Sequence, residues 1–336
     1  MKALQIAEPG APEGLALVEL RDPAPGPGEV LLRVRAIALN YRDLAMVKGA
    51  YPNTPTPLIP FSDACAVVEA VGEGVTRVEP GDRVATLFHQ AWLDGPPTAE
   101  KLSRPLAQGA PGVGRELLVL SEEGVSKVPE HLTDEQAATL PCAALTAWRV
   151  LFEDGGRLAG ETVVLEGTGG VSVFGLQFAH AAGLRTIVTS SSDAKLERAR
   201  ALGADYLINY RRTPEWSAEV LRITEGRGAE TILEVGGAGT FPEALKAVAV
   251  GGKVGVIGMV SGMPNAVDAR SLIRSNARLA GVFVGSRAMF EAMGRAIAFR
   301  GIEPVVDEVF PWADAAAALR LMERGGHFGK IVLKVG

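Results

Sequence analysis

Three small residues follow an apolar run near the middle of the chain, in the stretch VVLEGTGGVSVFG that starts at Val163. Gly167, Gly169 and Ser172 have the spacing of a turn that grips a dinucleotide, where all three positions are usually glycine. The first glycine permits the tight turn, the second lets the backbone approach a pyrophosphate, and the third allows close packing of helix on strand. Serine is small enough for the third position, so the stretch predicts a phosphate site. A glycine-rich turn that binds nothing is the alternative.

The residues that would meet the ribose lie about twenty positions further on, in IVTSSSDAK. An NAD-binding protein usually carries an acid there, which accepts from the ribose 2′-hydroxyl. This chain has Ser190 and Ser191 instead, with Lys195 one helical turn later. Tyr210 and Arg211, in INYRR, could close over the same group. The missing acid and the added cations favour NADP(H), although serines that only cap a helix are the alternative.

This turn stands at the head of an alternation of strands and helices that begins at Glu161. Apolar runs predict strands at 162–167, 185–191, 205–209, 230–237, 252–258 and 278–285, with helical stretches such as 195–203 and 242–251 between them. Such an alternation is typical of a parallel sheet covered on both faces, the doubly wound α/β class. The last strand would leave an apolar edge, so we expect a homodimer that pairs across a two-fold axis.

The N-terminal part of the chain has a different pattern. Runs rich in β-branched residues at 29–39, 64–75 and 81–88 alternate with Pro- and Gly-rich turns, which predicts a compact, barrel-like β domain. Residues 90–114 form a polar connection without periodicity, interpreted as a surface lobe or lid. A helical segment should begin after Thr133 and break or kink at Pro141. The C-terminal residues, with helices near 289–300 and 313–324 and a closing strand, should return to this first domain.

Composition excludes several classes of protein. The 336 residues carry a formal net charge of −5, which argues against a general nucleic-acid binder. No apolar run is long enough to cross a bilayer, and the first residues lack the apolar core of a signal peptide. Cys65 and Cys142 are too few for a disulfide framework or a four-thiolate zinc site. We therefore expect a cytoplasmic protein whose partner is a small molecule, not a nucleic acid or a membrane.

Over essentially its whole length the sequence resembles the medium-chain dehydrogenase/reductase superfamily. The motifs that carry the resemblance are EVLLRVRAIALNYRDL, VVEAVGEGVTRVEPGDRV, LPCAALTAWRVL, GTGGVSVFG, ARALGAD and GHFGKIV. The resemblance implies a GroES-like substrate domain, residues 1–130 and 286–336, and a Rossmann NADP-binding domain, residues 131–285. Zinc-dependent members have a Cys in the segment matching LNYRD, a His where Ser62 stands, and a second Cys matching Cys142. Here Asn40 and Ser62 replace two of the three ligands, so we expect no metal.

The resemblance also implies which residues form the site. Asn40, Tyr51, Ser62 and Cys142 would lie near the reacting atoms, and Tyr51 could donate a hydrogen bond or a proton unless it is an exposed turn residue. The residues expected to bind the nucleotide are Thr146, Gly167, Thr168, Gly169, Gly170, Val171, Ser190, Ser191, Lys195, Tyr210, Val235, Gly258, Val284 and Lys330. Lys330 matches the cation that the family places over the pyrophosphate, although a solvated lysine is the alternative. Asp43 is interpreted as structural, Asp63 as the anchor of a network beneath the site, and His89 as a residue that could border the pocket.

These expectations combine into one functional hypothesis. The chain resembles the zinc-free branch of the family, the quinone and enone reductases, and would pass hydride from NADPH to a quinone or an α,β-unsaturated carbonyl compound in a cleft between its domains. Such an acceptor is already electrophilic, so it needs orientation and a hydrogen bond more than a metal. Two alternatives stay open at this point. One is an alcohol dehydrogenase, which would require a metal, and the other is an NADPH-binding sensor without turnover.

Overall fold

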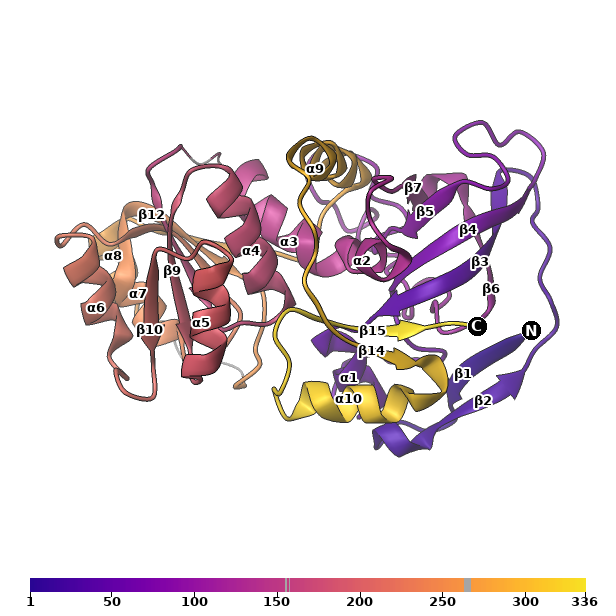
Figure 1. The fold of residues 1–336 in the computed structure, drawn as a ribbon, viewed down its shortest axis with the longest axis horizontal. Helices are drawn as coiled ribbons and strands as arrows, with labels where there is room; N and C mark the ends of the chain where they lie inside the picture. The colour runs from indigo at the N-terminus through magenta and orange to yellow at the C-terminus, as the bar shows by residue number, and fades with distance from the viewer. Residues whose placement is uncertain (155, 157, 263–266) are drawn as a thin grey trace. The chain divides into compact units, whose positions relative to one another are not determined.

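The computed structural model describes residues 1–154, 156, 158–262 and 267–336. The chain divides into two units: unit 1 comprises Met1–Leu145 and Val284–Gly336, and unit 2 comprises Thr146–Phe283 (Figure 1). The first boundary follows Leu145 rather than residue 130, because the helical segment after Thr133 packs on strands of unit 1. The return of the C-terminal residues to the first unit was expected from the sequence.

Unit 1 is built on a seven-stranded sheet, as counted over the described residues. Its order is β14 (Val306–Pro311), β15 (Lys330–Lys334), β3 (Glu29–Ala38), β4 (Asp63–Val71), β5 (Arg83–Thr86) and β7 (Val125–Lys127), and β6 (Leu117–Ser121) also pairs with β3. Strand β3 pairs antiparallel with both β4 and β15, so it joins the N-terminal strands to the C-terminal segment. A separate hairpin of β1 (Lys2–Ile6) and β2 (Leu15–Glu19) was not predicted.

Short helices connect and cover the strands of unit 1. They are α1 (Tyr41–Val47), α2 (Asp134–Ala138), a π-helical turn (Leu140–Ala144), α9 (Arg287–Arg300) and α10 (Ala315–Glu323), with 3₁₀ turns at Pro12–Gly14, Glu122–Gly124 and Trp312–Asp314. Thr133 caps α2 through a reciprocal bond with Gln136, as its position before an acidic turn indicates. Pro141 lies in the first turn of the π-helical segment, where the chain departs from α-helical geometry. Residues 90–114 contain no helix or strand, in keeping with the predicted lobe.

Unit 2 is a parallel sheet in the order β10-β9-β8-β11-β12-β13, which confirms the doubly wound class. Figure 1 labels β9, β10 and β12 of this sheet, with helices packed around it. The strands are β8 (Thr162–Glu166), β9 (Arg185–Ser190), β10 (Tyr206–Asn209), β11 (Ala229–Glu234), β12 (Val248–Val256) and β13 (Arg278–Gly281). The helices are α3 (Leu145–Trp148, whose first residue belongs to unit 1), a π-helical turn (Arg149–Glu153), α4 (Gly170–Ala181), α5 (Asp193–Ala201), α6 (Trp216–Ile223), α7 (Phe241–Ala247) and α8 (Ala269–Ser275). Strand order reverses between β8 and β11, and ligands of such sheets bind at the carboxyl ends of strands at this point.

The predicted strands of unit 2 are all present, and β13 forms an edge of the sheet as expected. It is shorter than predicted and only half-buried, with residues 282–285 outside the strand. Within the described part of the chain, no helix has the length and apolar character that a membrane crossing requires.

Candidate active site

Asn40 stands at the junction of β3 and α1, where the chain leaves the sheet. The backbone N–H of Leu39 still donates to the carbonyl of Ile331, at 3.0 Å, so the sheet holds the residue before it. The backbone N–H of Asn40 donates to the Asp43 carboxylate at 2.8 Å, and Asp43 is completely buried. An acid three residues after the N-cap that accepts from the cap backbone fixes the entry of a helix. The turn therefore holds Asn40 in a defined position, and Asp43 orders it.

Lys330 reaches the same place from the first residue of β15. Its side chain is buried, and its ammonium donates to the backbone carbonyl of Leu39 and to Oδ1 of Asn40, the latter at 2.6 Å. The alternative of a solvated lysine does not match this burial. The amine is thus hydrogen-bonded inside unit 1. Its expected contact with a nucleotide phosphate stays a prediction.

Asp63, the first residue of β4, anchors a second set of buried contacts. Ser62 donates through Oγ to one carboxylate oxygen of Asp63 at 2.6 Å, and the backbone N–H of Cys142 donates to the other at 2.9 Å. The Thr86 hydroxyl donates to the carbonyl of Ser62 at 2.9 Å. The Asp63 carboxylate thereby ties Ser62 and the π-helical turn to β4, and Thr86 ties β5 to Ser62 beside it. The anchoring role of Asp63 beneath a site stays a prediction.

The two carboxyl groups, the thiol and the amine of this cluster influence one another's ionisation. Burial raises the pKa of Asp43 to about 7, and the charge of Arg42 opposes that rise only in part. Burial also raises the pKa of Asp63, against the opposing charge of Lys330. Burial and the neighbouring Asp63 carboxylate raise the pKa of the Cys142 thiol, and burial lowers the pKa of Lys330. Cys142 is therefore an inert thiol at neutral pH, not an activated nucleophile.

Tyr51 is half-buried and packs against the core of unit 1. The guanidinium of Arg42 lies 5.3 Å from the centroid of its ring and 4.9 Å from that of Phe88, and donates to the carbonyl of Leu106 at 2.9 Å. Arg42 thus connects Tyr51 to helix α1, which begins next to Asn40. His89 is buried with its ring 4.9 Å from that of Phe88, so it is a packed core residue.

In unit 2 the glycine turn has the open geometry that a phosphate requires. Gly167 has φ = 74°, and a Cβ built there or on Gly169 would meet no atom within 4 Å. Gly169 is the N-cap of α4 and offers no capping side chain to the first N–H groups of that helix. The backbone N–H of Gly167 donates to the Thr189 hydroxyl at 3.4 Å, which ties the turn to β9. Free N–H groups at a helix N-terminus form an anion site.

Ser172, the departure from the three-glycine pattern, has a partner of its own. It is buried, and its hydroxyl donates to the carbonyl of Glu166 at 2.6 Å, across the turn. Close approach of helix and sheet occurs one turn later at Gly175, where a Cβ would lie 2.8 Å from a methyl of Leu165 and 3.0 Å from one of Leu233. Ser172 therefore stabilises the turn by a hydrogen bond. The close packing of helix on sheet comes instead from Gly175, which the sequence analysis did not single out.

The residues predicted near the ribose gather at the carboxyl ends of β9 and β10. Ser190 ends β9, and its carbonyl accepts from the backbone N–H of Tyr210 at 3.1 Å. Ser191 follows it and is half-buried, and Ser192 caps α5 by accepting from the backbone N–H of Lys195 at 3.4 Å. The chain thus brings Ser190, Ser191, Tyr210 and the first turn of α5 to one edge of the sheet.

An acid does occur close to this edge, in the first turn of α5. Asp193 accepts from the Asn209 amide at 2.7 Å and pairs with Arg212, and these contacts lower its pKa. Arg211, beside Arg212, is exposed. The negative charge of Asp193 is therefore already matched by a cation of the next loop.

The remaining predicted residues divide between the units. Thr168, Gly170 and Val171 belong to the turn and the first turn of α4. Val235 and Gly258 follow β11 and β12, and a Cβ on Gly258 would come within 2.8 Å of the Val235 carbonyl, so these two are neighbours. Thr146 opens unit 2 and is buried, whereas Val284 opens the returning segment of unit 1 and has φ = 56°, unusual for a β-branched residue.

Comparison with known proteins places this arrangement in a family. Residues 26–130 match the model of the alcohol dehydrogenase GroES-like domain, and residues 170–298 match that of the zinc-binding dehydrogenase. A zinc-type alcohol dehydrogenase-like protein of Schizosaccharomyces pombe is 42% identical over 316 residues, which are 92% of this chain and 91% of that protein. The chain belongs to the medium-chain dehydrogenase/reductase superfamily. It is an oxidoreductase of that superfamily, with a GroES-like and a Rossmann domain.

Other members of the superfamily are similar over most of their length. A quinone oxidoreductase of Pseudomonas aeruginosa is 34% identical over 80% of this chain and 76% of that protein, and an acryloyl-coenzyme A reductase of Sulfurisphaera tokodaii is 30% identical over 77% of each. The crystal structure of an NAD-dependent alcohol dehydrogenase superposes with a TM-score of 0.90 at 34% identity and covers 100% of both chains. A mycobacterial protein in complex with NADPH gives 0.84 at 29% identity and covers 99% of both.

Zinc, which zinc-dependent members of the superfamily carry, does not fit the donors at this position. Oδ1 of Asn40 accepts from the Lys330 ammonium, whose charge would repel a cation, and the Ser62 hydroxyl is committed to Asp63. Cys142 is left as the one thiol at these three positions, and a single Cys with an amide and a hydroxyl is a poor donor set for zinc. Over residues 1–154, 156, 158–262 and 267–336, no three or more His, Cys, Asp or Glu side chains are grouped as metal ligands.

Sequence reasoning missed two buried carboxyl groups beside the glycine turn. Glu166 ends β8 and Glu234 ends the neighbouring β11. Glu234 accepts from the backbone N–H groups of Gly236 and Gly237, both at 2.7 Å, while burial and the nearby charge of Glu234 raise the pKa of Glu166. The signal in the sequence was an acid that follows the apolar residues at the end of each of two strands, TVVLE and AETILE. These acids hold the loop after β11, where Val235 lies.

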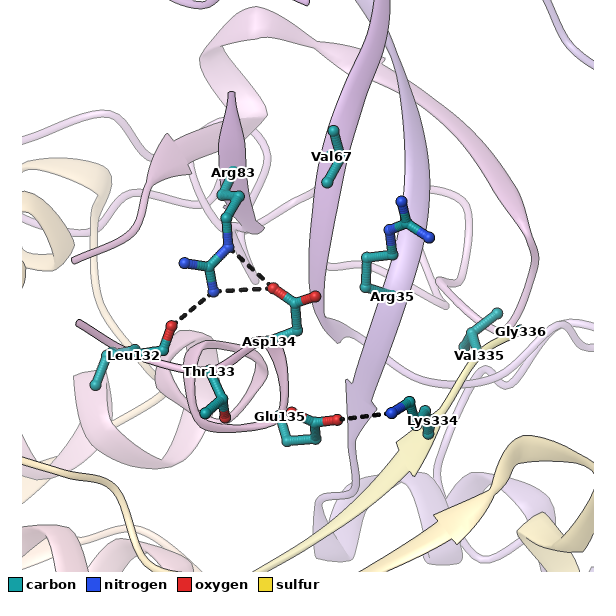
Figure 2. Close-up of a pocket in the computed structure, with 10 residues that line it drawn as sticks. All are labelled: Arg35, Val67, Arg83, Leu132, Thr133, Asp134, Glu135, Lys334, Val335 and Gly336. Carbon is teal, nitrogen blue, oxygen red and sulfur yellow. Dashed lines mark hydrogen bonds and ion pairs between the residues drawn. The ribbon is translucent and has the colours of Figure 1, made fainter. Parts of the chain in front are cut away.

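A hollow of about 660 Å³ on unit 1 contains none of the predicted site residues (Figure 2). Arg83 in its wall donates to Asp134 and to the carbonyl of Leu132, at 2.7 Å for the latter, and Lys334 lies 3.8 Å from Glu135. These cations already have partners within the wall, so the hollow adds nothing to the active site.

Proposed function

We propose that this oxidoreductase is a zinc-independent reductase that transfers hydride from NADPH to a quinone or an α,β-unsaturated carbonyl compound. The observation that carries the proposal is the cluster at the former ligand positions, in which Asn40 and Ser62 are bound to Lys330 and Asp63 rather than poised for a metal. An alcohol needs a Lewis acid to form an alkoxide, whereas a conjugated acceptor needs a donor for its oxygen.

Unit 2 would hold the nucleotide through its backbone. The pyrophosphate would lie on the N–H groups at Gly169, Gly170 and Val171, at the uncapped start of α4. Gly167, whose φ is positive, leaves the space for that approach. The nucleotide supplies the hydride, and the protein's part is to bind and orient it.

Preference for NADPH rests on the edge formed by β9 and β10. Ser190 and Ser191 offer hydroxyls where an NAD-binding chain offers a carboxylate, and Lys195 and Arg211 add positive charge. Asp193 would not repel a 2′-phosphate strongly, because Arg212 neutralises it. The similarity to the mycobacterial protein in complex with NADPH supports this preference.

Unit 1 would hold the acceptor. The Asn40 amide would donate to its carbonyl oxygen, and a proton would come from Tyr51 or from water. The similarity to a quinone oxidoreductase and to an acryloyl-coenzyme A reductase supports an acceptor that is a quinone or carries a double bond conjugated to a carbonyl group.

Calorimetry with NADPH and NADH tests the nucleotide. We expect the wild type to bind NADPH at least about tenfold more tightly than NADH. Ser191→Asp should weaken the binding of NADPH by about tenfold and leave the affinity for NADH nearly unchanged. Ser191→Ala is the matched control, because it alters the same position without adding charge. A wild type that prefers NADH contradicts the proposal.

Turnover tests the reaction and separates its rivals. Loss of reduced nicotinamide absorbance with a panel of enones, enals and quinones is the expected result, in protein that elemental analysis finds free of zinc. Stoichiometric zinc with oxidation of alcohols would favour the alcohol dehydrogenase. Tight NADPH binding with no turnover of any acceptor would favour the sensor.

A further inference from the structure

The amine of Lys330 makes two contacts inside unit 1, and both lie at the junction that carries Asn40. It donates to the backbone carbonyl of Leu39 and to Oδ1 of Asn40, at 2.6 Å for the latter. Both side chains are at least nine-tenths buried. The two residues are 290 positions apart in the sequence, so the contact exists only because β15 pairs with β3.

This contact decides which end of the Asn40 amide is available. An ammonium has three donors and no acceptor, so it can bind the amide only through its oxygen. The backbone of Asn40 is fixed separately, by its bond to Asp43. The nitrogen Nδ2 is therefore the end of the amide that is not bound to Lys330 and can donate to a ligand. Nδ2 carries two N–H donors. It faces the Asp63 carboxylate and lowers the pKa of that group as a hydrogen-bond donor, but no partner among the described residues lies within full hydrogen-bond distance, so at least one N–H is left for a ligand.

We propose that Lys330 is a positioning residue that turns the Asn40 amide so that Nδ2 is presented, as a donor, to the carbonyl oxygen of the acceptor. This inference rests on the proposed function. When the electrophilic carbon gains hydride from the reduced nucleotide, which is oxidised, the conjugated electron pair moves to that oxygen. A proton from Tyr51 or from water then completes the product. A donor directed at this oxygen stabilises the negative charge as it forms.

Two other roles for the lysine give different results. A cation that serves the nucleotide phosphate would act on nucleotide binding, and a lysine that only balances the buried carboxylates would act on stability. The variants that separate these roles are Lys330→Met, which keeps the length of the side chain without its donors, and Asn40→Asp, which keeps an acceptor for Lys330 but removes the amide donor. Lys334→Met is the matched control, because Lys334 lies on the same strand with its side chain 63% exposed.

Steady-state kinetics of the full chain with a conjugated acceptor is the first measurement. We expect Asn40→Asp to lower kcat by about 100-fold, the usual loss on removing one donor to a developing oxyanion. Lys330→Met should lower kcat by about tenfold with the Kd for NADPH unchanged, and the double variant should fall no further than Asn40→Asp alone. Lys330→Arg, also a donor without acceptors, should recover part of the lost rate. Lys334→Met should match the wild type.

A second measurement does not depend on turnover. The side-chain NH₂ resonances of Asn40, assigned by their disappearance in Asn40→Asp, should shift in Lys330→Met and stay in place in Lys334→Met. A Lys330→Met protein with normal kcat and weakened NADPH binding would overturn the proposal in favour of the phosphate role. Losses in the two single variants that multiply in the double variant, or resonances that do not move, would overturn it as well. Absence of wild-type turnover would reject the proposed function, and the resonances alone would then decide whether Lys330 orients the amide.

Discussion

Replacement of Asp43 by asparagine should remove a large part of the pH dependence of unit 1 stability. Asp43 is completely buried, and burial raises its pKa from 3.8 to about 7. The folded state therefore holds the proton more tightly than the unfolded state does. The stabilisation from this proton is complete below the unfolded pKa and is lost as the pH rises through the folded one. The amide that Asp43→Asn introduces would carry no such proton at any pH.

The magnitude follows from the pKa values in the two states. A rise from 3.8 to about 7 corresponds to about 4 kcal/mol over the full pH range, at 1.36 kcal/mol per unit. Between pH 5 and pH 8 the wild type should lose about 2–3 kcal/mol of that amount, whereas the stability of Asp43→Asn should not change through this group. An amide oxygen can still accept from the Asn40 backbone, but the new NH₂ group is buried. This adds a cost of about 1–3 kcal/mol, which does not vary with pH and leaves the slope unaffected.

Hydrogen exchange at increasing urea, read by mass spectrometry on peptides that cover α1, measures the opening free energy of unit 1 separately from that of unit 2. The difference in opening free energy between Asp43→Asn and the wild type should change by about 2–3 kcal/mol from pH 5 to pH 8, in favour of the variant. Asp94→Asn, at an exposed position of the same unit, is the control and should give a constant difference. A constant difference for Asp43→Asn as well would show that Asp43 is ionised throughout and would refute the reasoning from burial.

Three further predictions concern packing and reactivity. Ser172→Ala should lower the stability of unit 2 by about 1 kcal/mol, because the hydrogen bond to the Glu166 carbonyl is lost, and Ser172→Gly should lower it by about 1 kcal/mol more. Urea unfolding measures both, and stabilities equal to that of the wild type would contradict a stabilising role for this hydrogen bond. Gly175→Ala should cost about 1–3 kcal/mol because its Cβ meets Leu165 at 2.8 Å, whereas Gly294→Ala, in open space on α9, should stabilise by about 1 kcal/mol. Iodoacetamide at pH 8 should leave Cys65, which is buried and has a pKa of about 12, unmodified in the native protein but not in urea. Cys142, which is partly exposed but has a raised pKa, should react slowly; rapid native labelling of either thiol, detected by mass spectrometry, would contradict this expectation.

The fold of unit 2 could be predicted because its signals are local. Each strand is a short apolar run and each connection carries a helix, so periodicity alone defines a parallel sheet. The same method missed β1 and β2, whose residues are partly exposed and do not alternate cleanly. It also missed the π-helical geometry around Pro141. A break or kink at Pro141 could be predicted, but nothing in the local pattern indicates that it takes π-helical form, and nothing distinguishes β1 and β2 from turns.

The candidate site could be predicted as a set of positions but not as a set of contacts. The sequence identified NYRD and the closing GKIV as segments that contribute to the site, and the resemblance predicted that Lys330 lies near a phosphate. The bond from Lys330 to Asn40 depends on the pairing of β15 with β3, which no local pattern encodes. The pairing of Glu166 with Glu234 likewise depends on the adjacency of β8 and β11 in the sheet.

Asn40 and Ser62, which stand where the resemblance places zinc ligands, belong to a buried cluster whose charges must be balanced. Asp43 and Asp63 are both completely buried, and an uncompensated buried carboxylate is costly. Lys330 and Arg42 supply the compensating charge, since both lower the pKa of Asp43 against the effect of burial. Removal of Lys330 should therefore raise the pKa of both carboxyl groups, and the rate lost in Lys330→Met should be compared with the wild type over a range of pH. A loss that persists at every pH belongs to the orientation of Asn40, whereas a loss confined to one side of neutrality belongs to the protonation of the carboxylates.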